Sequence, residues 1–417
     1  MSNPTPCPSA RLAPAILLGL GLVVGAPACT RAGSNNGPLV ESASDSFDRN
    51  GMLDNLGRNT VLPAYESFVS ESSALLTATT LYADALRNGA ADVTQRRDDA
   101  RAAWRSTMAV WQRCEIFQFG PAGSSLEVIG GEDRREQIYS YPTINRCRVD
   151  QEIVEGNFSA SGYPAGELVN VFGLDALEQL LFDDSTENAC PPQATINSDG
   201  SWDALVSGGT LAQRRADYAV VLARHLSLQA RGLRDRWSPS ADNFVRDFAN
   251  AGLAGSPYPS AQGAVNDVYI GMFYVDSITK DLKLATPLGL SGPNGVDPSA
   301  VESPLSRRSK EHILANLRAF QELYLGNAPG DADRLGFDDF LAELGADALA
   351  MTVTMEIAAA IAAVEAIPGT LSDALTNNPS SVQSAHDAVR VVTTRLKAEL
   401  PTILNLRVPQ QGAGDND

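Results

Sequence analysis

The sequence predicts an all-α protein made of two helical bundles, and three observations support this prediction. Apolar residues recur at spacings of three and four through most of the chain, which is the period of an amphipathic helix. Several of these stretches end in Asn-Gly, Gly-Pro or Gly, which are helix stop signals. Alternating Val-rich runs bounded by hairpin turns, which would indicate strands, do not occur in the sequence.

Long amphipathic segments follow one another along the chain. The predicted helices are 62–89, 94–119 (halted by Gly120-Pro121), 211–237, 308–326, 337–367 and 381–405. Together with shorter patterned stretches they make roughly eight helices, more than one four-helix bundle holds, so we expect two bundle-like halves. Trp104 and Trp111 lie seven positions apart in the second segment and are expected in the core.

The predicted domain borders follow from composition. In "WSPSADNF", Pro239 and polar residues follow the third long helix, which places the N-terminal bundle at 51–238 and the C-terminal bundle at 239–408. Residues 409–417 are expected to form a disordered tail. Two long loop insertions, 184–209 and 285–306, interrupt the helical pattern, and long irregular segments of this kind are often functional.

Residues 1–28 have the pattern of a lipoprotein-type signal peptide. An arginine precedes the apolar run "LAPAILLGLGLVVG", which is too short to span a bilayer, and small residues lead to Cys29, which would carry the lipid. Pro27, and the lack of Leu three residues before Cys29, also leave plain secretion with cleavage nearby open. Thr30 after the cysteine favours the outer membrane, and 29–50 are expected to form a flexible tether.

We therefore expect a protein of the cell envelope, either an outer-membrane lipoprotein or a periplasmic protein. No second apolar run of 18 or more residues is recognised in the sequence, so a spanning protein is not expected. The net charge of −18 argues against nucleic acid as a partner, because phosphates require Lys and Arg.

Cysteine positions predict one disulfide. After removal of the signal, and with Cys29 lipidated, Cys114, Cys147 and Cys190 remain. Cys114 lies in a helical pattern, whereas Cys147 and Cys190 are both next to loops, so we predict the Cys147–Cys190 pair. A CxxC spacing does not occur, which argues against a metal site built from cysteines.

Two carboxylates, Asp175 and Glu178, lie three residues apart within the otherwise apolar helical stretch 171–182. Residues at this spacing share one helix face, and two neighbouring carboxylates repel each other unless a cation or proton lies between them. A structural interpretation is also open. Asp175 can stabilise the start of the helix, and Glu178 can pair with an arginine such as Arg134.

The histidines do not form a recognisable metal motif. His225, His312 and His386 share no common spacing and are expected to be partly exposed polar residues. The sequence HExxH is absent, which argues against a thermolysin-type zinc peptidase.

Several segments, taken in order and spacing, carry a family resemblance. They include "NTVLPAYESF", "EIFQFGP", "IYSYP", "FGLDALEQLLF", "KLATPLG" and "VESPLSRRSKEHILANLRAFQELYLG". In these segments, from about residue 55 to residue 400, the chain resembles the imelysin-like family, also known as the imelysin peptidase family, of exported bacterial proteins.

The resemblance implies two helical bundles related by an internal repeat, with a site between them near the helix at 172–182. Members of the family include a metal-dependent peptidase, iron-regulated outer-membrane and periplasmic proteins, and parts of iron-uptake systems. The Gly-x-His-x-x-Glu pattern of the family falls on Gly173, Asp175 and Glu178, so an aspartate replaces the histidine. This exchange favours hard cations such as Ca²⁺, Mg²⁺ or ferric iron over Zn²⁺.

The leading hypothesis is an envelope-anchored protein that binds a metal or a small ligand between the bundles and serves iron acquisition, with iron-uptake components as partners. The metal would be iron or another hard divalent cation. Expected metal ligands are Asp175, Glu178, Glu115 and Glu302. Ser306 and Arg134 are expected as further ligand contacts.

Two other functions stay open. One is a metallopeptidase of the imelysin type, in which Glu178 would act as general base beside a metal-bound water. The other is a polysaccharide-binding module, which requires a basic groove. The basic clusters available for such a groove are Arg134, Arg135, Arg307 and Arg308.

Overall fold

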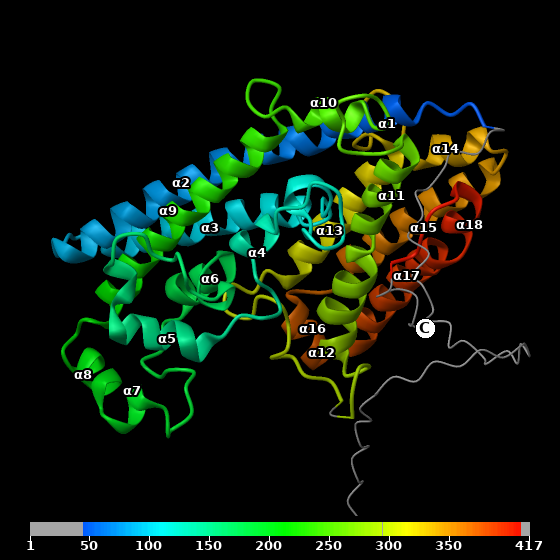
Figure 1. The fold of residues 1–417 in the computed structure, drawn as a ribbon. Helices are drawn as coiled ribbons and strands as arrows, with labels where there is room; N and C mark the ends of the chain where they lie inside the picture. Colours follow the sequence, from blue (N-terminus) through cyan, green and yellow to red (C-terminus); the bar gives the residue numbers. More distant parts are fainter. Residues whose placement is uncertain (1–44, 294, 410–417) are drawn as a thin grey trace, which may run out of the picture. The chain divides into compact units, whose positions relative to one another are not determined.

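Helices are the regular elements throughout the part of the chain that the structure describes. This computed structural model describes residues 45–293 and 295–409, and these ranges contain no β-strand (Figure 1). The prediction of an all-α protein is therefore confirmed. The predicted signal peptide 1–28, the candidate lipidation site Cys29 and residues 410–417 of the predicted tail lie outside the described residues.

The elements from α1 to α9 belong to the first half of the chain. Element η1 is a π-helix, and η2 to η4 are single turns of 3₁₀-helix. The bounds are α1 Arg49–Asn55, η1 Leu56–Val61, α2 Leu62–Arg87, α3 Val93–Cys114, η2 Gly120–Ala122, α4 Arg134–Ile138, α5 Arg146–Glu155, η3 Asn157–Ser159, η4 Val169–Val171, α6 Leu174–Phe182, α7 Thr195–Ser198, α8 Ser201–Ser207 and α9 Leu211–Trp237.

The elements from α10 to α18 follow. Element η5 is a π-helix of 11 residues, an unusual length because π-helices mostly occur as single-turn bulges. The bounds are α10 Phe244–Ala249, α11 Ala261–Met272, η5 Val275–Ala285, α12 Thr286–Leu288, α13 Ser309–Leu325, α14 Phe337–Glu343, α15 Asp347–Glu365, α16 Leu371–Asn377, α17 Pro379–Lys397 and α18 Glu399–Leu404.

Four helices of the first half pack in a ring. Helix α2 lies against both α3 and α9, and α6 contacts the same two helices, which is the arrangement of a four-helix bundle (Figure 1). Trp104 and Trp111 of α3 are buried in this group, as predicted from their spacing. Trp104 also donates a hydrogen bond of 2.8 Å from Nε1 to the Leu174 carbonyl at the start of α6. The tryptophan thus holds α6 against α3.

Four elements of the second half form a similar ring. Helix α13 contacts α15 and η5, and α17 contacts the same two elements. Val353, Ile357, Ala360 and Val364 form the buried stripe of α15, one side chain on each turn. By length and composition alone, α15 is apolar enough to cross a membrane, so the expectation of no second such run is corrected. One stripe of α15 packs against α13, α14 and α17, but only 28% of its apolar window is buried, and Met351 and Met355 are exposed on its other side.

The two rings are joined by direct contact between α3 and α13, and all described residues belong to one compact unit. The predicted border at 238–239 lies within packed structure. The Trp237 ring is 4.9 Å from the Phe244 ring and 5.6 Å from the Phe248 ring, measured between centroids. The chain therefore passes from one ring to the other without an exposed linker at this point.

The last residues of the predicted tether are part of the packed structure. Helix α1 begins at Arg49 and contacts α10 and α11. Phe47 stacks on Phe340 with 4.5 Å between ring centroids, and the Arg49 guanidinium lies over the same Phe340 ring. The predicted boundary at residue 50 is therefore too late in the chain.

The first predicted loop insertion contains two short helices, α7 and α8, and one end of a disulfide. Cys147, at the start of α5, and Cys190, in the segment before α7, form the predicted pair. Cys114 is a buried free thiol. The second insertion is mostly irregular and leads from α12 to α13, and its residues 301–306 return to the interior beside α6.

Candidate functional site

Helix α6 carries the two carboxylates singled out from the sequence, and its start depends on Gly173. This glycine has φ +96°, and a Cβ at this position would lie 2.8 Å from the Ile138 carbonyl oxygen. Only glycine combines that backbone conformation with such a close approach. The tight start brings both Asp175 and Glu178 into the interior, where 8% and 3% of their surfaces are exposed.

Asp175 is held by donors at the helix start and from the neighbouring segment. Its Oδ2 accepts hydrogen bonds from the Ser140 hydroxyl at 2.6 Å and the Ser140 amide at 3.2 Å. Its Oδ1 accepts the amide of Ala176 at 2.9 Å. Asp175 therefore has the structural role considered from the sequence, in which a carboxylate satisfies free N–H groups near a helix start.

Glu178 contacts the second half of the chain. Its Oε1 accepts a hydrogen bond of 2.7 Å from the backbone amide of Ser306, a residue 128 positions away. The suggested pair with Arg134 does not form, because Arg134 pairs with Glu132 at 2.6 Å. Two of the predicted site residues, Glu178 and Ser306, are thus joined directly, while Arg134 lies elsewhere.

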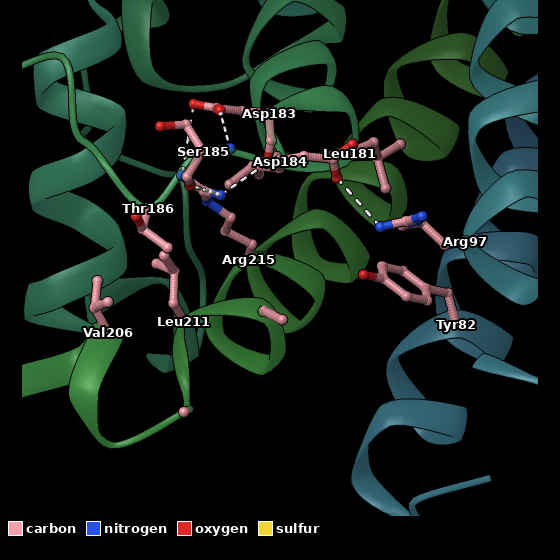
Figure 2. Close-up of a pocket in the computed structure, with 13 residues that line it drawn as sticks. Tyr82, Arg97, Leu181, Asp183, Asp184, Ser185, Thr186, Val206, Leu211 and Arg215 are labelled. Carbon is pink, nitrogen blue, oxygen red and sulfur yellow. Dashed lines mark hydrogen bonds and ion pairs between the residues drawn. The ribbon is translucent and has the colours of Figure 1, made fainter. Parts of the chain in front are cut away.

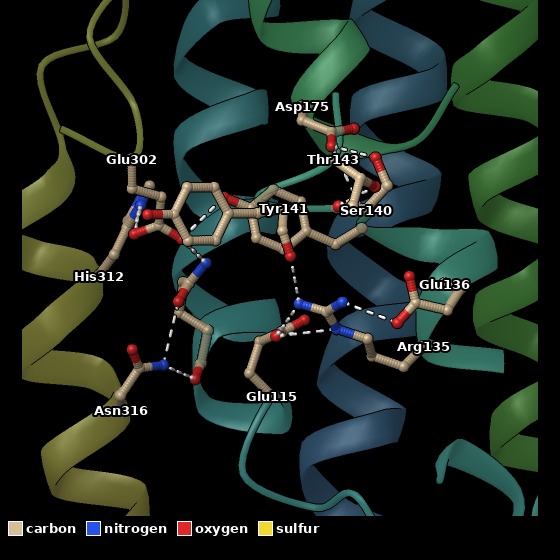
Figure 3. A network of polar contacts seen from close by, with 12 residues as sticks. Glu115, Arg135, Glu136, Ser140, Tyr141, Thr143, Asp175, Glu302, His312 and Asn316 are labelled. Carbon is tan, nitrogen blue, oxygen red and sulfur yellow. Dashed lines mark hydrogen bonds and ion pairs between the residues drawn. The ribbon is translucent and has the colours of Figure 1, made fainter. Parts of the chain in front are cut away.

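A network of buried polar side chains surrounds Glu302 (Figure 3). Glu302 Oε1 lies 2.9 Å from Lys283 Nζ and accepts hydrogen bonds from Tyr139 at 2.7 Å and Gln112 at 3.0 Å. Its Oε2 lies 3.2 Å from His312 Nδ1. We call this network the polar cluster; its members are Gln112, Glu115, Arg135, Tyr139, Lys283, Glu302, His312 and Asn316.

Charge compensation sets the protonation of Glu302. Burial by itself raises the pKa of this carboxyl, but Lys283 and His312, with the hydrogen bonds from His312 and Tyr139, outweigh burial and hold it at about 2. Glu302 is therefore a buried carboxylate at neutral pH. Lys283, which is fully buried, is its principal counter-charge.

Lys283 lies in the π-helix η5 and makes three short contacts at the junction of the two rings. Besides Glu302, its ammonium donates to Gln112 Oε1 at 2.7 Å and to Asn316 Oδ1 at 2.8 Å. Asn316 in turn donates to the Gln112 carbonyl at 2.7 Å. Because π-helical segments are frequent at functional sites, the position of Lys283 on η5 favours a functional role for this junction.

Glu115 forms the other end of the polar cluster and is fully enclosed. Its Oε2 is 3.2 Å from Arg135 Nη2, while its Oε1 has no hydrogen-bond partner among the described residues. Burial raises the pKa of Glu115, whereas Arg135, Lys283 and the nearby Tyr274 hydroxyl lower it. The Tyr65 hydroxyl is also buried without a partner in the described ranges, and the Tyr274 hydroxyl, close to Glu115, lacks a well-formed hydrogen bond there. Unpartnered buried polar groups are rare in native proteins, so their concentration here requires a cause.

The α6 carboxylates differ from Glu302 because, among the described residues, no cation forms an ion pair with either of them. Burial raises the pKa of Asp175 to about 6, against the opposing effect of its Ser140 and backbone hydrogen bonds. Burial likewise raises the pKa of Glu178 to about 7, and the Ser306 donors only partly offset it. Both groups therefore change charge in the range between mildly acidic and neutral pH.

The raised pKa of Glu178 predicts how the free energy of unfolding depends on pH. The pKa of Glu178 is about 7 in the folded protein and 4.5 for the free side chain, so the folded state binds its proton more tightly. Protonation of Glu178 therefore stabilises the folded state. This stabilisation is complete below the pKa of the free side chain and is lost as pH rises through the pKa of the folded protein. Glu178→Gln keeps an oxygen acceptor for Ser306 but removes the titration. Its unfolding free energy relative to wild type is therefore expected to rise by about 3 kcal/mol from about pH 4 to about pH 8.

Urea unfolding of both proteins across this pH range measures the effect. Glu365→Gln is the matched control, because Glu365 is half-exposed and paired with Arg318 at the surface. A parallel pH dependence in wild type and Glu178→Gln would contradict the prediction.

The histidine expectation needs correction. His312 and His386 are buried rather than partly exposed, with 2% and 8% of their surfaces accessible. His225 is intermediate, as expected. His312 belongs to the polar cluster through Glu302. Sequence reasoning failed for His312 because its partner lies ten positions earlier, in an irregular segment that does not follow the helical period.

Sequence reasoning missed Lys283, Tyr139 and Gln112. Gln112 and Tyr139 reach Glu302 from 190 and 163 positions away, so no local spacing links them. The available signal was weak: Lys280 and Lys283 are three positions apart, in a segment that also carries Asp276 and Asp281.

The four predicted metal ligands do not fit a preformed metal site. Glu115 is paired with Arg135, and Glu302 with Lys283, while Asp175 and Glu178 accept hydrogen bonds from Ser140 and Ser306. Within residues 45–293 and 295–409, no group of three or more His, Cys, Asp or Glu side chains could hold a metal ion. We therefore derive no metal-dependent peptidase step for these residues, Glu178 included.

The basic clusters proposed for polysaccharide binding are neutralised within the protein. Arg307 pairs with Asp373, and Arg308 with Glu311 at 3.0 Å. Arg134 pairs with Glu132, and Arg135 is drawn inward to Glu115. These arginines do not line a common basic groove in the structure.

Comparison with known proteins identifies the family. The family model for imelysin, Peptidase_M75, matches residues 61–397, which is most of the chain. The chain belongs to the imelysin family. The matched residues run from α2 to α17 and include α6 and all residues of the polar cluster.

Proteins that are similar to this chain include two that are named as iron-regulated. The chain is 25% identical over 271 residues to "Iron-regulated protein A" of Synechococcus elongatus, covering 64% of this chain and 61% of that protein. It thus spans less than two thirds of the relative's length.

Two crystal structures share the imelysin fold. One, described as an iron-regulated protein A precursor from Parabacteroides distasonis, has a TM-score of 0.64 at 17% identity and covers 87% of this chain and 97% of that one. The other, an imelysin-like protein from Psychrobacter arcticum, has a TM-score of 0.62 at 18% identity and covers 89% and 99%.

Proposed function

We propose that this imelysin-family protein binds a small polar ligand at the polar cluster and serves iron acquisition at the cell envelope, where Cys29 anchors it to lipid. The iron role is supported by the name of the Synechococcus elongatus relative. The envelope location is supported by the signal-like sequence before Cys29.

The observation that carries the proposal is the set of unpartnered polar atoms at the polar cluster and its edge. Glu115 Oε1, the Tyr274 hydroxyl and the Ser306 hydroxyl are each buried and lack a well-formed hydrogen bond in the part of the chain that the structure describes, although Tyr274 lies close to Glu115 and Ser306 close to Glu178. Each such group costs about 1–3 kcal/mol. A ligand that supplies the missing donors and acceptors recovers this free energy, which favours binding.

The charges of the cluster indicate what kind of ligand fits. Lys283 and Arg135 lie beside the carboxylates and would repel a bare cation. We therefore expect a polar molecule with both donors and acceptors, and iron would reach this site as a complex with an organic ligand. Iron is the cargo in this proposal.

The proposal is tested in a deletion strain grown with limiting iron. The strain is expected to grow slowly and to accumulate less iron, and the wild-type gene to restore both. Tyr274→Phe removes a buried hydroxyl that lacks a well-formed hydrogen bond, so it is expected to fold normally but to fail in complementation.

Tyr163→Phe is the matched control, since Tyr163 bonds to Tyr218 outside the polar cluster. Normal iron content in the deletion strain would overturn the iron role. Full complementation by Tyr274→Phe would overturn the assignment of the cluster as the site. Fractionation of the complemented strain is expected to place the protein with the membranes.

A further inference from the structure

A cavity that is separate from the polar cluster lies in the first half of the chain, at the start of α9 (Figure 2). Its volume is about 290 Å³, and its walls come from α2, α3, the end of α6 with the following loop, and α9. Residues that define it include Tyr82, Arg97, Asp184, Leu211, Ala212 and Arg215. None of the polar cluster residues lines this cavity.

Arginines give the cavity its charge. Arg215 is more than nine-tenths buried, and its Nη1 donates to the carbonyls of Asp183 and Ser185 at 2.7 and 2.9 Å. Its Nε–H has no hydrogen-bond partner in the described ranges. Arg97 lies 3.2 Å from Asp184, and its Nε–H is likewise buried and unpartnered within those ranges.

The positive charges outnumber the negative ones at this place. Arg101 shares Asp184 with Arg97, at 2.6 Å, and Asp183 lies 3.5 Å from Arg215. Three guanidinium groups therefore face two carboxylates, in a chain whose net charge is −18. Burial raises the pKa of Tyr82, and all three arginines act in the opposite direction, so their fields converge at this wall of the cavity.

The start of α9 adds a second source of positive potential. This helix has 27 residues, begins at Leu211 and has no side-chain cap from Thr210. Leu211 and Ala212, its first two residues, line the cavity. The amides of an uncapped first turn have no partner within the helix, and together with the helix dipole they attract anions.

We propose that this cavity binds a small anion that carries carboxylate or phosphate groups, held by Arg97, Arg215 and the first turn of α9. Arginine forks suit both groups because they present paired N–H donors to two oxygens. The volume is at the lower end of the range for ligand pockets, about 300–1,000 Å³, which selects a compact anion. This binding site is independent of the polar cluster and of the proposed iron role.

Calorimetric titration of the full-length protein tests the proposal, with inorganic phosphate in one arm and citrate in the other. Binding of one equivalent of at least one of these anions is expected, weakening as salt is added. Ala212→Asp places a carboxylate on the cavity wall and is expected to weaken binding by about tenfold or more. The introduced carboxylate lies in the first turn of α9, where it stabilises the helix through the helix dipole, so folding is expected to be retained.

Ala348→Asp is the matched control, because Ala348 is also exposed and also the second residue of its helix, α15. It makes the same substitution away from the cavity and is expected to leave affinity unchanged. Binding of phosphate alone, or of citrate alone, supports the site and identifies the group that it prefers. Equal affinity in wild type and Ala212→Asp, or no binding of either anion, would overturn the proposal.

Discussion

Replacing Lys283 by methionine is expected to lower the free energy of unfolding by about 3–5 kcal/mol, because it leaves a buried carboxylate without its counter-charge. The Lys283 ammonium and the Glu302 carboxylate are both inaccessible to solvent and lie 2.9 Å apart. The same substitution leaves the acceptors Gln112 Oε1 and Asn316 Oδ1 without the ammonium donor. Methionine fills most of the volume, so the loss comes mainly from charge and hydrogen bonding.

Urea unfolding followed by circular dichroism measures this loss. The double variant Lys283→Met/Glu302→Gln is expected to recover much of it, since it removes the charge that the single variant leaves unpaired. Arg318→Met is a surface control, because its pair with Glu365 is half-exposed, and it is expected to cost at most about 1 kcal/mol. A single Lys283→Met variant as stable as this control would show that Glu302 does not depend on the lysine.

Removing the disulfide is the second change with a large expected effect. Cys147 and Cys190 are 43 positions apart, and a cross-link of that span restricts the unfolded chain. The chain-entropy relation for a loop of this length gives a stabilisation of about 4 kcal/mol. Cys147→Ser/Cys190→Ser is therefore expected to lower the unfolding free energy by about that amount.

Reduction provides the control for the disulfide. Wild-type protein in dithiothreitol is expected to unfold at the same urea concentration as the double variant, and dithiothreitol is expected to leave the double variant unchanged. Equal stability of wild-type and double-variant proteins under oxidising conditions would contradict the prediction.

Helical periodicity predicted where most of the long helices lie, because burial of one face imposes that period on the sequence. The prediction 62–89 corresponds to α2, Leu62–Arg87, and 308–326 to α13, Ser309–Leu325. Periodicity did not locate every end. Predicted helix 337–367 is divided into α14 and α15 at Gly345, whose φ of +75° a helix cannot contain.

The end of α3 shows why apolar spacing can mislead. The prediction placed the end of this helix at Gly120-Pro121, whereas the helix ends at Cys114. Ile116, Phe117 and Phe119 continue the apolar pattern after the helix has ended, because they remain in the core as irregular chain. Burial thus maintains a pattern that the backbone no longer follows.

The carboxylates of the candidate site could be identified from the sequence, but their partners could not. Glu115, Asp175, Glu178 and Glu302 are all buried, which is unusual for carboxylates and agrees with a special role. Whether each one meets a cation, a hydroxyl or an amide depends on contacts between distant segments. Glu178 meets Ser306 only because residues 301–306 return to α6, and no local rule describes that return.

The anchoring of α1 also has a consequence for the order in which the molecule can be assembled. Arg49 donates to Gln262, which itself donates to the Leu404 carbonyl in α18, and Asn55 donates to the Gly326 carbonyl. A chain emerging from the ribosome, or crossing a membrane, with its N-terminus first presents α1 long before these partners exist. Helix α1, the earliest helix in the described part of the chain, is therefore among the last to dock, and a chain that stops before α18 would leave α1 without this connection. Completion of the native structure must therefore wait for nearly the whole polypeptide.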